Sequence, residues 1–445
     1  MGMNIFYWIV LLATFAGIYF LGSRTELKLW ARVVIALVLG VIIGFIFGDL
    51  AQTSKWIGDL FVRLIRMLVI PLIFTSLVAG VVSMGDPKRL GTIGLKTIGL
   101  YLMTTLFAII IGLGLGSIFQ PGQGMDLTGV EPFISRNAST SVTDQLFGII
   151  PENPISSLAN GQVLPVIFFS ILLGIGIIMG GEKTKSLGDV FASAAEAVLK
   201  IAHLVMQLAP YGVLSLIAWV SGTLGMEALQ TMLKLTTLLY CGCVLHMILV
   251  YGGALKFIIR LPLIRFFRGI ADAQAVAYST SSSSATLPIT IQCVQKNLGV
   301  SQSVSSSVLP LGATINMDGT ALYLGIVALF SAQYFGIDLA LSDYFLIALT
   351  VTLTSIGTAG IPSASLFLLA AVLSVIGISD TQTALIVGFI FPVDRVLDMA
   401  RTVVNITGDA TVSVIVAKSE NELDESTFRD EVENGHRYTS WAETC

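Results

Sequence analysis

A stripe of polar residues inside an apolar segment near the C-terminus carries the clearest chemical signal in the sequence. At about 100° per residue of an α-helix, its side chains project within an arc of roughly 100°. An ionisable group at the centre of a membrane span costs at least about 2.5–3.5 kcal/mol, so three carboxylates and an arginine must be paired or used. The stripe predicts a buried binding centre, with an internal lattice of ion pairs as the alternative. Its members are Asp394, Asp398, Arg401, Thr402, Asn405 and Asp409.

The residue types on this stripe suit an amino acid with an acidic side chain. Arg401 offers a planar fork that binds a carboxylate through two parallel hydrogen bonds. Asp398, one turn earlier, can bind an ammonium group. Asn405, with backbone amides around Ser283, can hold the α-carboxylate, because unpaired N–H groups at helix ends bind anions. The zwitterion then has three separate anchors.

Further oxygen donors in the C-terminal half can bind a cation. Hard oxygen ligands suit a hard cation, and sodium is the natural transported ion, because weakly held monovalent ions exchange readily whereas Ca²⁺-type sites recruit more carboxylates. The residues themselves leave protons open as the coupling ion. The donors are Asp318, Asp409, Asn316 and backbone carbonyls near Gly312 and Ser355.

Two polar runs interrupt the last apolar stretches, STSSSSATLP at 279–288 and SIGTAGIPSAS at 355–365. Each lies within an apolar stretch, which favours the tip of a re-entrant hairpin over a flexible linker. Irregular backbone in a membrane must line a protein cavity, where its free amides and carbonyls can bind a ligand. A polar segment follows each tip, NMDGT at 316–320 and the stripe at 394–409. Such doubled interruptions indicate a secondary transporter with internal repeats.

The composition explains what positions these groups. The chain has 445 residues, of which 55% are hydrophobic and 12% charged, against roughly 25% charged in soluble proteins. Apolar runs long enough to cross a bilayer begin near residues 4, 31, 56, 90, 162, 190 and 228. The first is read as an extra N-terminal span, because no basic residue precedes it and no cleavage pattern follows. Basic clusters at 24–32, 88–96, 183–185 and 256–268 are expected to face the cytoplasm.

The remaining features give no chemical signal. Residues 418–445 hold eight Asp and Glu against three Lys and Arg, so the net charge of −4 belongs to a solvated, partly helical tail. The four cysteines have no metal or disulfide spacing and are expected to be core thiols. The three histidines share no period, and we read them as packed residues: His203, His246 and His436.

Several ordered motifs resemble one known family. The sequence is similar to the glutamate/aspartate transporters, also called dicarboxylate/amino acid:cation symporters, over about residues 30–418. The resemblance rests on NGQVLP at 160–165, SSSSATLP at 281–288, NMDGTALY at 316–323, SIGTAGIP at 355–362 and LDMARTVVNITGD at 397–409.

The resemblance implies an all-α polytopic membrane protein with eight core transmembrane helices, two re-entrant helical hairpins, inverted repeats and, here, an extra N-terminal span. It also implies a homotrimer in which a transport domain moves like an elevator against a fixed scaffold. The implied division is residues 1–30 for the extra span, 31–89 and 121–226 for the scaffold with its loop, 90–120 and 227–418 for the transport domain, and 419–445 for the tail. Within 227–418 it places span 6, hairpin 1 at about 264–296, span 7 at 302–335, hairpin 2 at 342–378 and span 8 at 382–418.

The same resemblance implies two groups of site residues. The substrate would contact Ser282, Ser283, Thr320, Asp398, Arg401, Thr402 and Asn405, with the second hairpin tip from Ile361 to Ser365 as a gate. One sodium ion would bind Gly312, Asn316, Asn405 and Asp409; another would bind Thr314, Ser355, Ile356 and Thr358; a third would bind Tyr101, Thr104, Thr105, Asn316 and Asp318.

Two positions depart from the family's pattern. Archaeal members carry an arginine where this chain has Ser281, and animal members carry it at the position of Met399. Arg395 is a candidate substitute, although it projects about 100° away from Asp394. At Leu324 the animal proteins carry the glutamate that takes the co-transported proton. Leucine cannot ionise, so we expect sodium coupling without proton transport at this position.

We therefore expect a sodium-driven symporter of L-aspartate or L-glutamate, not an enzyme, in the lipid bilayer of a plasma membrane, most simply a bacterial inner membrane, with no nucleic-acid partner. Neutral amino acid relatives carry a smaller residue at Arg401, so acidic substrates are favoured. The alternative is a proton-coupled symporter of acidic amino acids or C4-dicarboxylates. A hydrolase with paired aspartates is disfavoured by Arg401 between Asp398 and Asp409, and a passive channel would not need a guanidinium fork and two gates.

Overall fold

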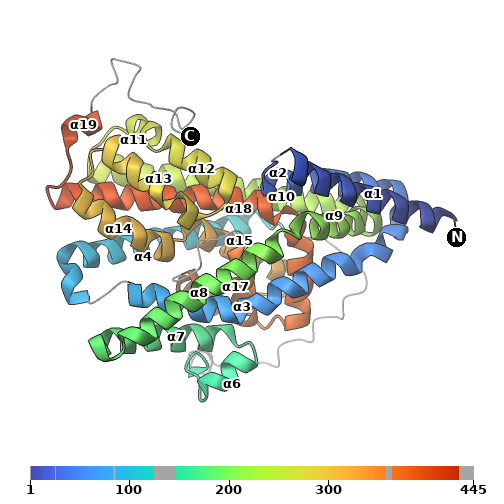
Figure 1. The fold of residues 1–445 in the computed structure, drawn as a ribbon, viewed down its shortest axis with the longest axis horizontal. Helices are drawn as coiled ribbons and strands as arrows, with labels where there is room; N and C mark the ends of the chain where they lie inside the picture. Colours follow the sequence, from blue (N-terminus) through green and yellow to red (C-terminus); the bar gives the residue numbers. More distant parts are fainter. Residues whose placement is uncertain (1, 26, 84–86, 125–146, 356–362, 430–445) are drawn as a thin grey trace.

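The computed structural model describes residues 2–25, 27–83, 87–124, 147–355 and 363–429 (Figure 1). These residues form helices joined by loops, and the only strand-like pairing among them is an isolated antiparallel bridge between Val300 and Leu423. The all-α fold predicted from the apolar runs is therefore confirmed.

The N-terminal half of the described chain supplies a group of long apolar helices that pack on one another. Helix α2 crosses α9, while α3 packs along α7, α8 and α9. The elements are α1 (Gly2–Arg24), α2 (Leu29–Phe47), η1 (Gly48–Ser54), α3 (Lys55–Ser83), α4 (Pro87–Phe119), α6 (Pro154–Ala159), α7 (Val163–Gly180), η2 (Gly181–Lys183), α8 (Lys185–Met206), α9 (Ala209–Trp219) and η3 (Val220–Leu224).

The C-terminal half contains several shorter, interrupted helices and one helix of 40 residues. It comprises α10 (Gly225–His246), the π-helical turns η4 (Met247–Gly252) and η5 (Ala254–Ile258), α11 (Leu263–Gly269), α12 (Ala271–Thr280), α13 (Ser283–Lys296), α14 (Gln302–Ile315), α15 (Asp318–Tyr334), α16 (Leu341–Ser355), α17 (Ala364–Ser374), α18 (Asp380–Ser419) and α19 (Glu425–Arg429). The breaks after α12, α14 and α16 fall at the polar motifs singled out in the sequence.

Six stretches of the described chain are long and apolar enough to cross a membrane. Large apolar side chains on their outer surfaces are exposed, Ile46 by 68% and Met179 by 82%, as expected for a surface that faces lipid rather than water. The stretches are Gly2–Arg24, Leu29–Ser83, Thr92–Phe119, Val163–Lys183, Ala209–Ile258 and Gln302–Tyr334.

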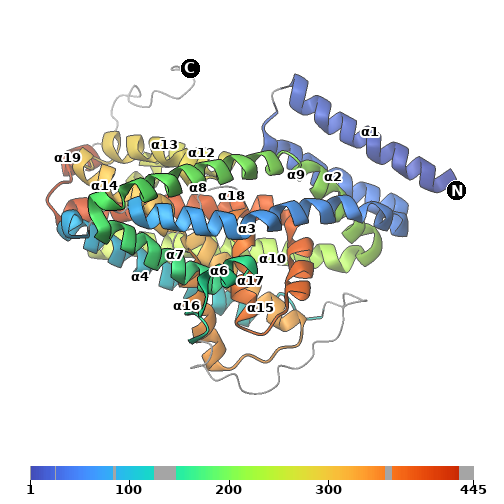
Figure 2. The same ribbon diagram turned by 60° about the horizontal axis from the view of Figure 1, so that its bottom comes forward.

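The predicted extra N-terminal span is present as α1, which lies at the edge of the molecule (Figure 2). Its buried residues are Tyr7, Leu11 and Ile18, and they join a small apolar cluster with residues of α2, η1 and α9. The Tyr7 hydroxyl hydrogen-bonds to Ser54 in η1. The rest of the helix surface is largely exposed, so α1 is fixed to the N-terminal helices along one stripe.

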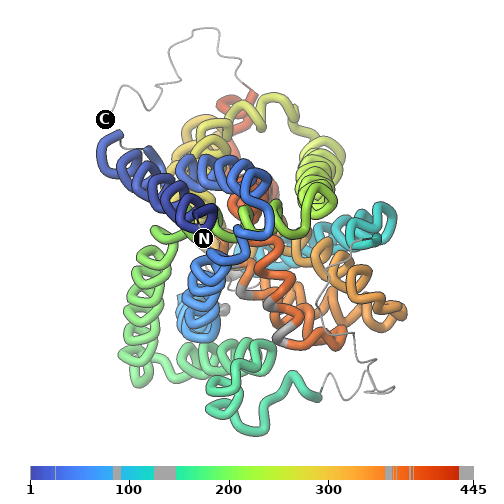
Figure 3. Tube along the Cα trace, turned by 90° about the vertical axis from the view of Figure 1, so that its right-hand side faces the viewer, coloured from blue at the N-terminus to red at the C-terminus, as the bar shows by residue number. Residues whose placement is uncertain are grey.

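Helix α18 lies at the centre of the molecule (Figure 3). It begins with a capping box in which Ser379 and Gln382 bond each other's backbone N–H groups. Along its 40 residues it packs against α12, α13, α14, α15 and α17 from the C-terminal half and against α4 and α9 from the N-terminal half. Both hairpin tips and the NMDGT motif are thereby brought to one helix.

The first residues of the acidic tail are held against the base of the first hairpin. Backbone N–H groups of Ser301 and Asp424 donate to the carbonyls of Glu422 and Gly299, at 3.1 and 2.8 Å. Phe428 in α19 is 0% exposed and joins the apolar cluster around α11 to α14. The sequence reading of a solvated tail thus missed a short docked segment, because a single apolar residue gives no period to detect.

Helices α4 and α15 cross at a glycine that leaves no room for a side chain. A Cβ atom at Gly112 would lie 2.5 Å from the carbonyl oxygen of Leu322, whereas a Cβ at Gly114 on the same helix would meet nothing within 4 Å. The crossing therefore requires the glycine at residue 112 and not the one at residue 114.

We expect Gly112→Ala to destabilise the protein by about 1–3 kcal/mol, because overpacking forces the two backbones apart. The measurement is the thermal unfolding midpoint of detergent-solubilised protein, with Gly114→Ala as the matched control. Equal midpoints for the two variants would contradict the close approach.

Candidate functional site

The polar stripe lies on α18 and is buried along its whole length. Its six residues are between 0% and 6% exposed. The apolar residues between them, such as Leu397 and Val404, are buried as well. The prediction that the stripe faces the interior is confirmed, but the helix is enclosed on its other faces too.

Arg401 is the charged centre of this stripe. Its Nη2 lies 3.0 Å from Oδ1 of Asp394 and 2.8 Å from Oδ1 of Asp398. Its Cζ lies 4.1 Å from the centroid of the Tyr323 ring, a cation–π contact. The guanidinium is fully buried, yet its Nε and Nη1 have no hydrogen-bond partner among the described residues. The lattice of ion pairs that was the alternative reading is therefore present, and the Nε and Nη1 N–H groups remain available to further acceptors.

The first hairpin tip brings helix ends to the same region. Helix α12 ends at Thr280, Ser281 adopts a left-handed conformation with φ of 52°, and Ser282 caps α13 by accepting a hydrogen bond from the Ala285 amide at 3.1 Å. Ser282 and Ser283 are 8% and 3% exposed. The N-terminus of α13 is thus a buried source of backbone N–H groups, which is the property predicted for this run.

The second hairpin tip contacts the stripe directly. The backbone N–H of Ser363 donates to Oδ2 of Asp398 at 2.8 Å. The Oγ of Ser365 is buried without a hydrogen-bond partner among the described residues. Asp398 therefore connects Arg401 to this tip. Of the predicted site residues, Ile356, Thr358 and Ile361 lie outside the described residues.

Arg395 reaches the first hairpin rather than the stripe. Its Nη2 donates to the backbone carbonyl of Thr280 at 3.2 Å, and the side chain is 6% exposed. Thr280 directly precedes Ser281, the position where archaeal members of the family carry an arginine that this chain lacks. A second guanidinium is therefore present at this tip, although it comes from α18.

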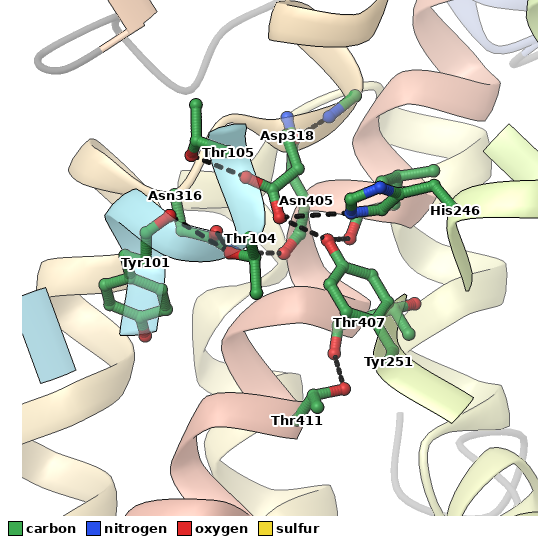
Figure 4. Close-up of polar contacts among 12 residues, drawn as sticks. Tyr101, Thr104, Thr105, His246, Tyr251, Asn316, Asp318, Asn405, Thr407 and Thr411 are labelled. Carbon is green, nitrogen blue, oxygen red and sulfur yellow. Dashed lines mark hydrogen bonds and ion pairs between the residues drawn. The ribbon is translucent and has the colours of Figure 1, made fainter. Parts of the chain in front are cut away.

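A second cluster surrounds the carboxylate of Asp318, as Figure 4 shows. Thr105 on α4 donates from Oγ1 to Oδ1 at 2.6 Å. Tyr251 donates its hydroxyl to Oδ2 at 2.7 Å, and Nε2 of His246 lies 3.3 Å from the same oxygen. The carboxylate is 0% exposed, so its charge is stabilised by these side chains rather than by bulk water.

Asn316 joins this cluster to α18. Its Nδ2 donates to Oδ1 of Asp409 at 2.9 Å and to the backbone carbonyl of Asn405 at 3.1 Å. The Asn405 side chain in turn accepts from the backbone N–H of Gly319 at 2.8 Å. A Cβ atom at Gly312 would lie 2.3 Å from Oδ1 of Asp409. The structure therefore brings together the four residues expected for the first sodium ion.

The third expected sodium set also converges, whereas the second is only partly described. Thr104 lies 3.4 Å from Oδ1 of Asn316, completing the neighbourhood of Thr105 and Asp318 (Figure 4). Tyr101 lies beside it and donates to the Val308 carbonyl at 3.1 Å. The hydroxyls of Thr314, Ser355 and Thr402 instead donate to carbonyls of their own helices, at Leu311, Thr352 and Asp398, and Thr320 is buried in the first turn of α15.

Sequence reasoning missed three residues of the site. His246 and Tyr251 contact Asp318, and Tyr323 stacks on Arg401. His246 and Tyr251 are five residues apart, which in an α-helix places their side chains about 140° from each other. Helical periodicity therefore gives no sign that they converge on one carboxylate. Tyr323 follows the NMDGT motif, but in the sequence a tyrosine that contacts Arg401 cannot be distinguished from one that only packs in the core.

Together, the apolar helices and the charged centre enclosed by broken helices define a multi-pass membrane transporter. The chain belongs to the sodium:dicarboxylate symporter family, whose sequence profile matches residues 29–419. The resemblance noted from the motifs is thus confirmed, and the family is one of transporters rather than enzymes. Helix α1 lies outside the matched range.

Several relatives in this family are named for the transport of acidic substrates. The proton/sodium-glutamate symport protein of Geobacillus stearothermophilus is 36% identical over 405 residues, 88% of this chain and 95% of the relative. The proton/glutamate-aspartate symporter of Escherichia coli (strain K12) is 36% identical over 412 residues, 88% and 93%. The C4-dicarboxylate transport protein of Bacillus subtilis (strain 168) is 34% identical over 416 residues, 91% and 97%. These bacterial relatives indicate an inner-membrane location.

Proposed function

We propose that this chain is a sodium-driven symporter of aspartate or glutamate. The observation that carries the proposal is the Arg401 guanidinium, which is fully buried with Nε and Nη1 unpartnered among the described residues. These N–H groups belong to a buried cation and need acceptors, and a carboxylate supplies both an acceptor and the opposite charge. The names of the glutamate and glutamate-aspartate relatives support an acidic amino acid as the substrate.

The remaining contacts support roles for the other groups of the substrate. The ammonium would bind Asp398, whose carboxylate lies between Arg401 and the second hairpin tip. The α-carboxylate would bind the amides at the start of α13 with the amide of Asn405, and the hydroxyls of Thr320 and Thr402 would complete the site. The bond from the Ser363 amide to Asp398 supports a gating role for the segment next to the second tip.

The charge balance supports coupling to a cation. Asp318 and Asp409 are 0% and 2% exposed, and neither pairs with a lysine or arginine among the described residues. Two buried carboxylates without a compensating strong cation are costly. Sodium ions bound at the Asp318 and Asp409 clusters would neutralise these two carboxylates, whereas Asp394 and Asp398 are balanced by Arg395 and Arg401.

The packing supports a division into two parts, one of which moves against the other. Helices α2, α3, α7, α8 and α9 pack mainly on one another. Helix α4 instead packs mainly on α15 and also on α14 and α18, which in turn pack against α12 and α13. We propose that the first group is the scaffold of a homotrimer. The second group would carry both clusters across the membrane as one body, in an elevator movement.

Proton coupling and C4-dicarboxylate transport are the competing functions, because relatives are named for each. Two residues favour sodium and an amino acid. Leu324 is fully buried in an apolar cluster and cannot take a proton. Asp398 provides a carboxylate that can bind an ammonium group, and C4-dicarboxylates have no ammonium group.

Competition of labelled aspartate uptake by unlabelled succinate separates the two kinds of substrate. Succinate is expected to compete weakly.

Proteoliposomes containing the purified protein test the proposal. Labelled aspartate is expected to accumulate under an inward sodium gradient and not under a proton gradient alone. Arg401→Cys should abolish this uptake, because the buried site loses the partner of the side-chain carboxylate, while exposed Arg268→Cys serves as the matched control. Sodium-independent accumulation would overturn the coupling, and an Arg401→Cys variant that still prefers acidic substrates would overturn the assignment of Arg401.

Arg395 is expected to increase the affinity of the first hairpin tip for an anion. Its charge sits at the carbonyl end of α12, where it offsets the negative end of that helix dipole beside the amides of α13. Removing the charge in Arg395→Met should raise KM for aspartate by about 5-fold, from the roughly 1 kcal/mol of such an interaction. Arg395→Lys should recover most of the affinity. A methionine variant with wild-type KM would contradict this role.

A further inference from the structure

The carboxylate of Asp318 is held by two residues from a π-helical turn. The turn η4 follows His246 directly and includes Tyr251. Hydrogen bonds in a π-helix join residues five apart, so His246 and Tyr251 lie on the same side of the turn instead of about 140° apart as in an α-helix. Their rings meet edge to face, with centroids 4.7 Å apart and planes at 85°. The turn thereby directs both polar groups to one point.

That point is a single oxygen of Asp318. The Tyr251 hydroxyl lies 2.7 Å from Oδ2 and the His246 Nε2 lies 3.3 Å from it, while Oδ1 is approached by Thr105. All three partners of the carboxylate are buried or nearly so, with His246 and Tyr251 both 0% exposed. The two oxygens therefore have different partners, and the side chain is fixed in rotation.

The partners of the two carboxylate oxygens differ in whether they leave the oxygen free to bind a cation. A threonine hydroxyl can turn its hydrogen away and offer its oxygen to a cation, so Thr105 and Oδ1 can act as ligands together. Towards an ionised carboxylate, which only accepts, Tyr251 and His246 act as donors. Oδ2 is therefore engaged by the protein, and Oδ1 is the oxygen that remains for a cation.

The same tyrosine also links the turn to α18. Its hydroxyl lies 3.2 Å from the carbonyl oxygen of Val404. A Cβ atom at Gly408 would lie 2.5 Å from this hydroxyl and 2.5 Å from Nδ2 of Asn316. The glycine directly before Asp409 thus lets the tyrosine and Asn316 approach the helix together, and the position of Asp318 is tied to that of Asp409.

We propose that His246 and Tyr251 are positioning residues for cation binding: the π-helical turn uses them to hold Oδ2 of Asp318, so that Oδ1 and Thr105 face the transported sodium. This inference rests on the proposed sodium coupling. In this proposal the π-helical turn and the buried His246 position the carboxylate. Neither His246 nor Tyr251 needs to contact the ion. π-helical turns are rare and occur often at functional sites.

The test compares sodium dependence across tyrosine variants in proteoliposomes. Tyr251→Phe removes only the hydroxyl and should raise the sodium concentration for half-maximal aspartate uptake by about 10-fold, the value of one hydrogen bond to a charged group. The maximal rate at saturating sodium should stay within about 2-fold of wild type. Tyr240→Phe is the matched control, because this tyrosine on α10 donates to the Val396 carbonyl rather than to Asp318.

A second readout separates positioning from a purely structural role. Direct sodium binding without substrate is followed by the sodium-induced rise in the unfolding midpoint of the detergent-solubilised protein. Tyr251→Phe should shift this dependence to higher sodium with an unchanged midpoint in sodium-free buffer. His246→Gln, which keeps a side-chain donor, should shift it less than His246→Ala, and this pair decides the question if Tyr251→Phe fails to fold.

The outcomes distinguish the two proposals. If wild-type uptake needs no sodium, the proposed function fails. If wild-type uptake is sodium-dependent but Tyr251→Phe and His246→Ala have wild-type sodium dependence, the positioning role alone fails. A loss of maximal rate or of stability without any change in sodium dependence would also overturn it, because that result marks a residue needed only for packing.

Discussion

The structure depends above all on how it accommodates a buried guanidinium. Arg401 is 0% exposed in the middle of a protein built from apolar helices, and Asp394 and Asp398 on the same helix each accept a bond from its Nη2. Leaving such a charge unpaired in a low-dielectric interior is strongly unfavourable. The helix that carries all three groups must therefore be enclosed, and the broken helices of the C-terminal half pack around it.

On α18, the residues proposed to bind the substrate, Asp398 to Asn405, and Asp409, which is proposed to bind a cation, lie on neighbouring turns. Asn405 belongs to both: its side chain accepts from Gly319, and its carbonyl accepts from Asn316, which also bonds Asp409. Any shift of α18 that alters the substrate centre therefore alters the cation cluster. This shared residue gives a physical basis for thermodynamic coupling between two ligands, which is reciprocal by necessity.

The binding centre and the first hairpin tip could be predicted from the sequence, because polar residues either followed helical spacing or interrupted an apolar run. The polar stripe followed helical spacing, and Ser281 to Ser283 broke an apolar run at the place where α12 gives way to α13. The pairing of Arg401 with two aspartates could be weighed but not decided, since ion pairing and ligand binding use the same residue types. The convergence of His246 and Tyr251 could not be foreseen, because it depends on a π-helical turn that leaves no mark on α-helical periodicity.

The most direct test of the account is equilibrium binding of labelled aspartate to the purified protein at a series of sodium concentrations, with potassium keeping the ionic strength constant. The account predicts that the affinity for aspartate rises steeply with sodium and that aspartate tightens sodium binding by the same factor. An aspartate affinity that is the same with and without sodium would contradict the claim that α18 couples the two centres.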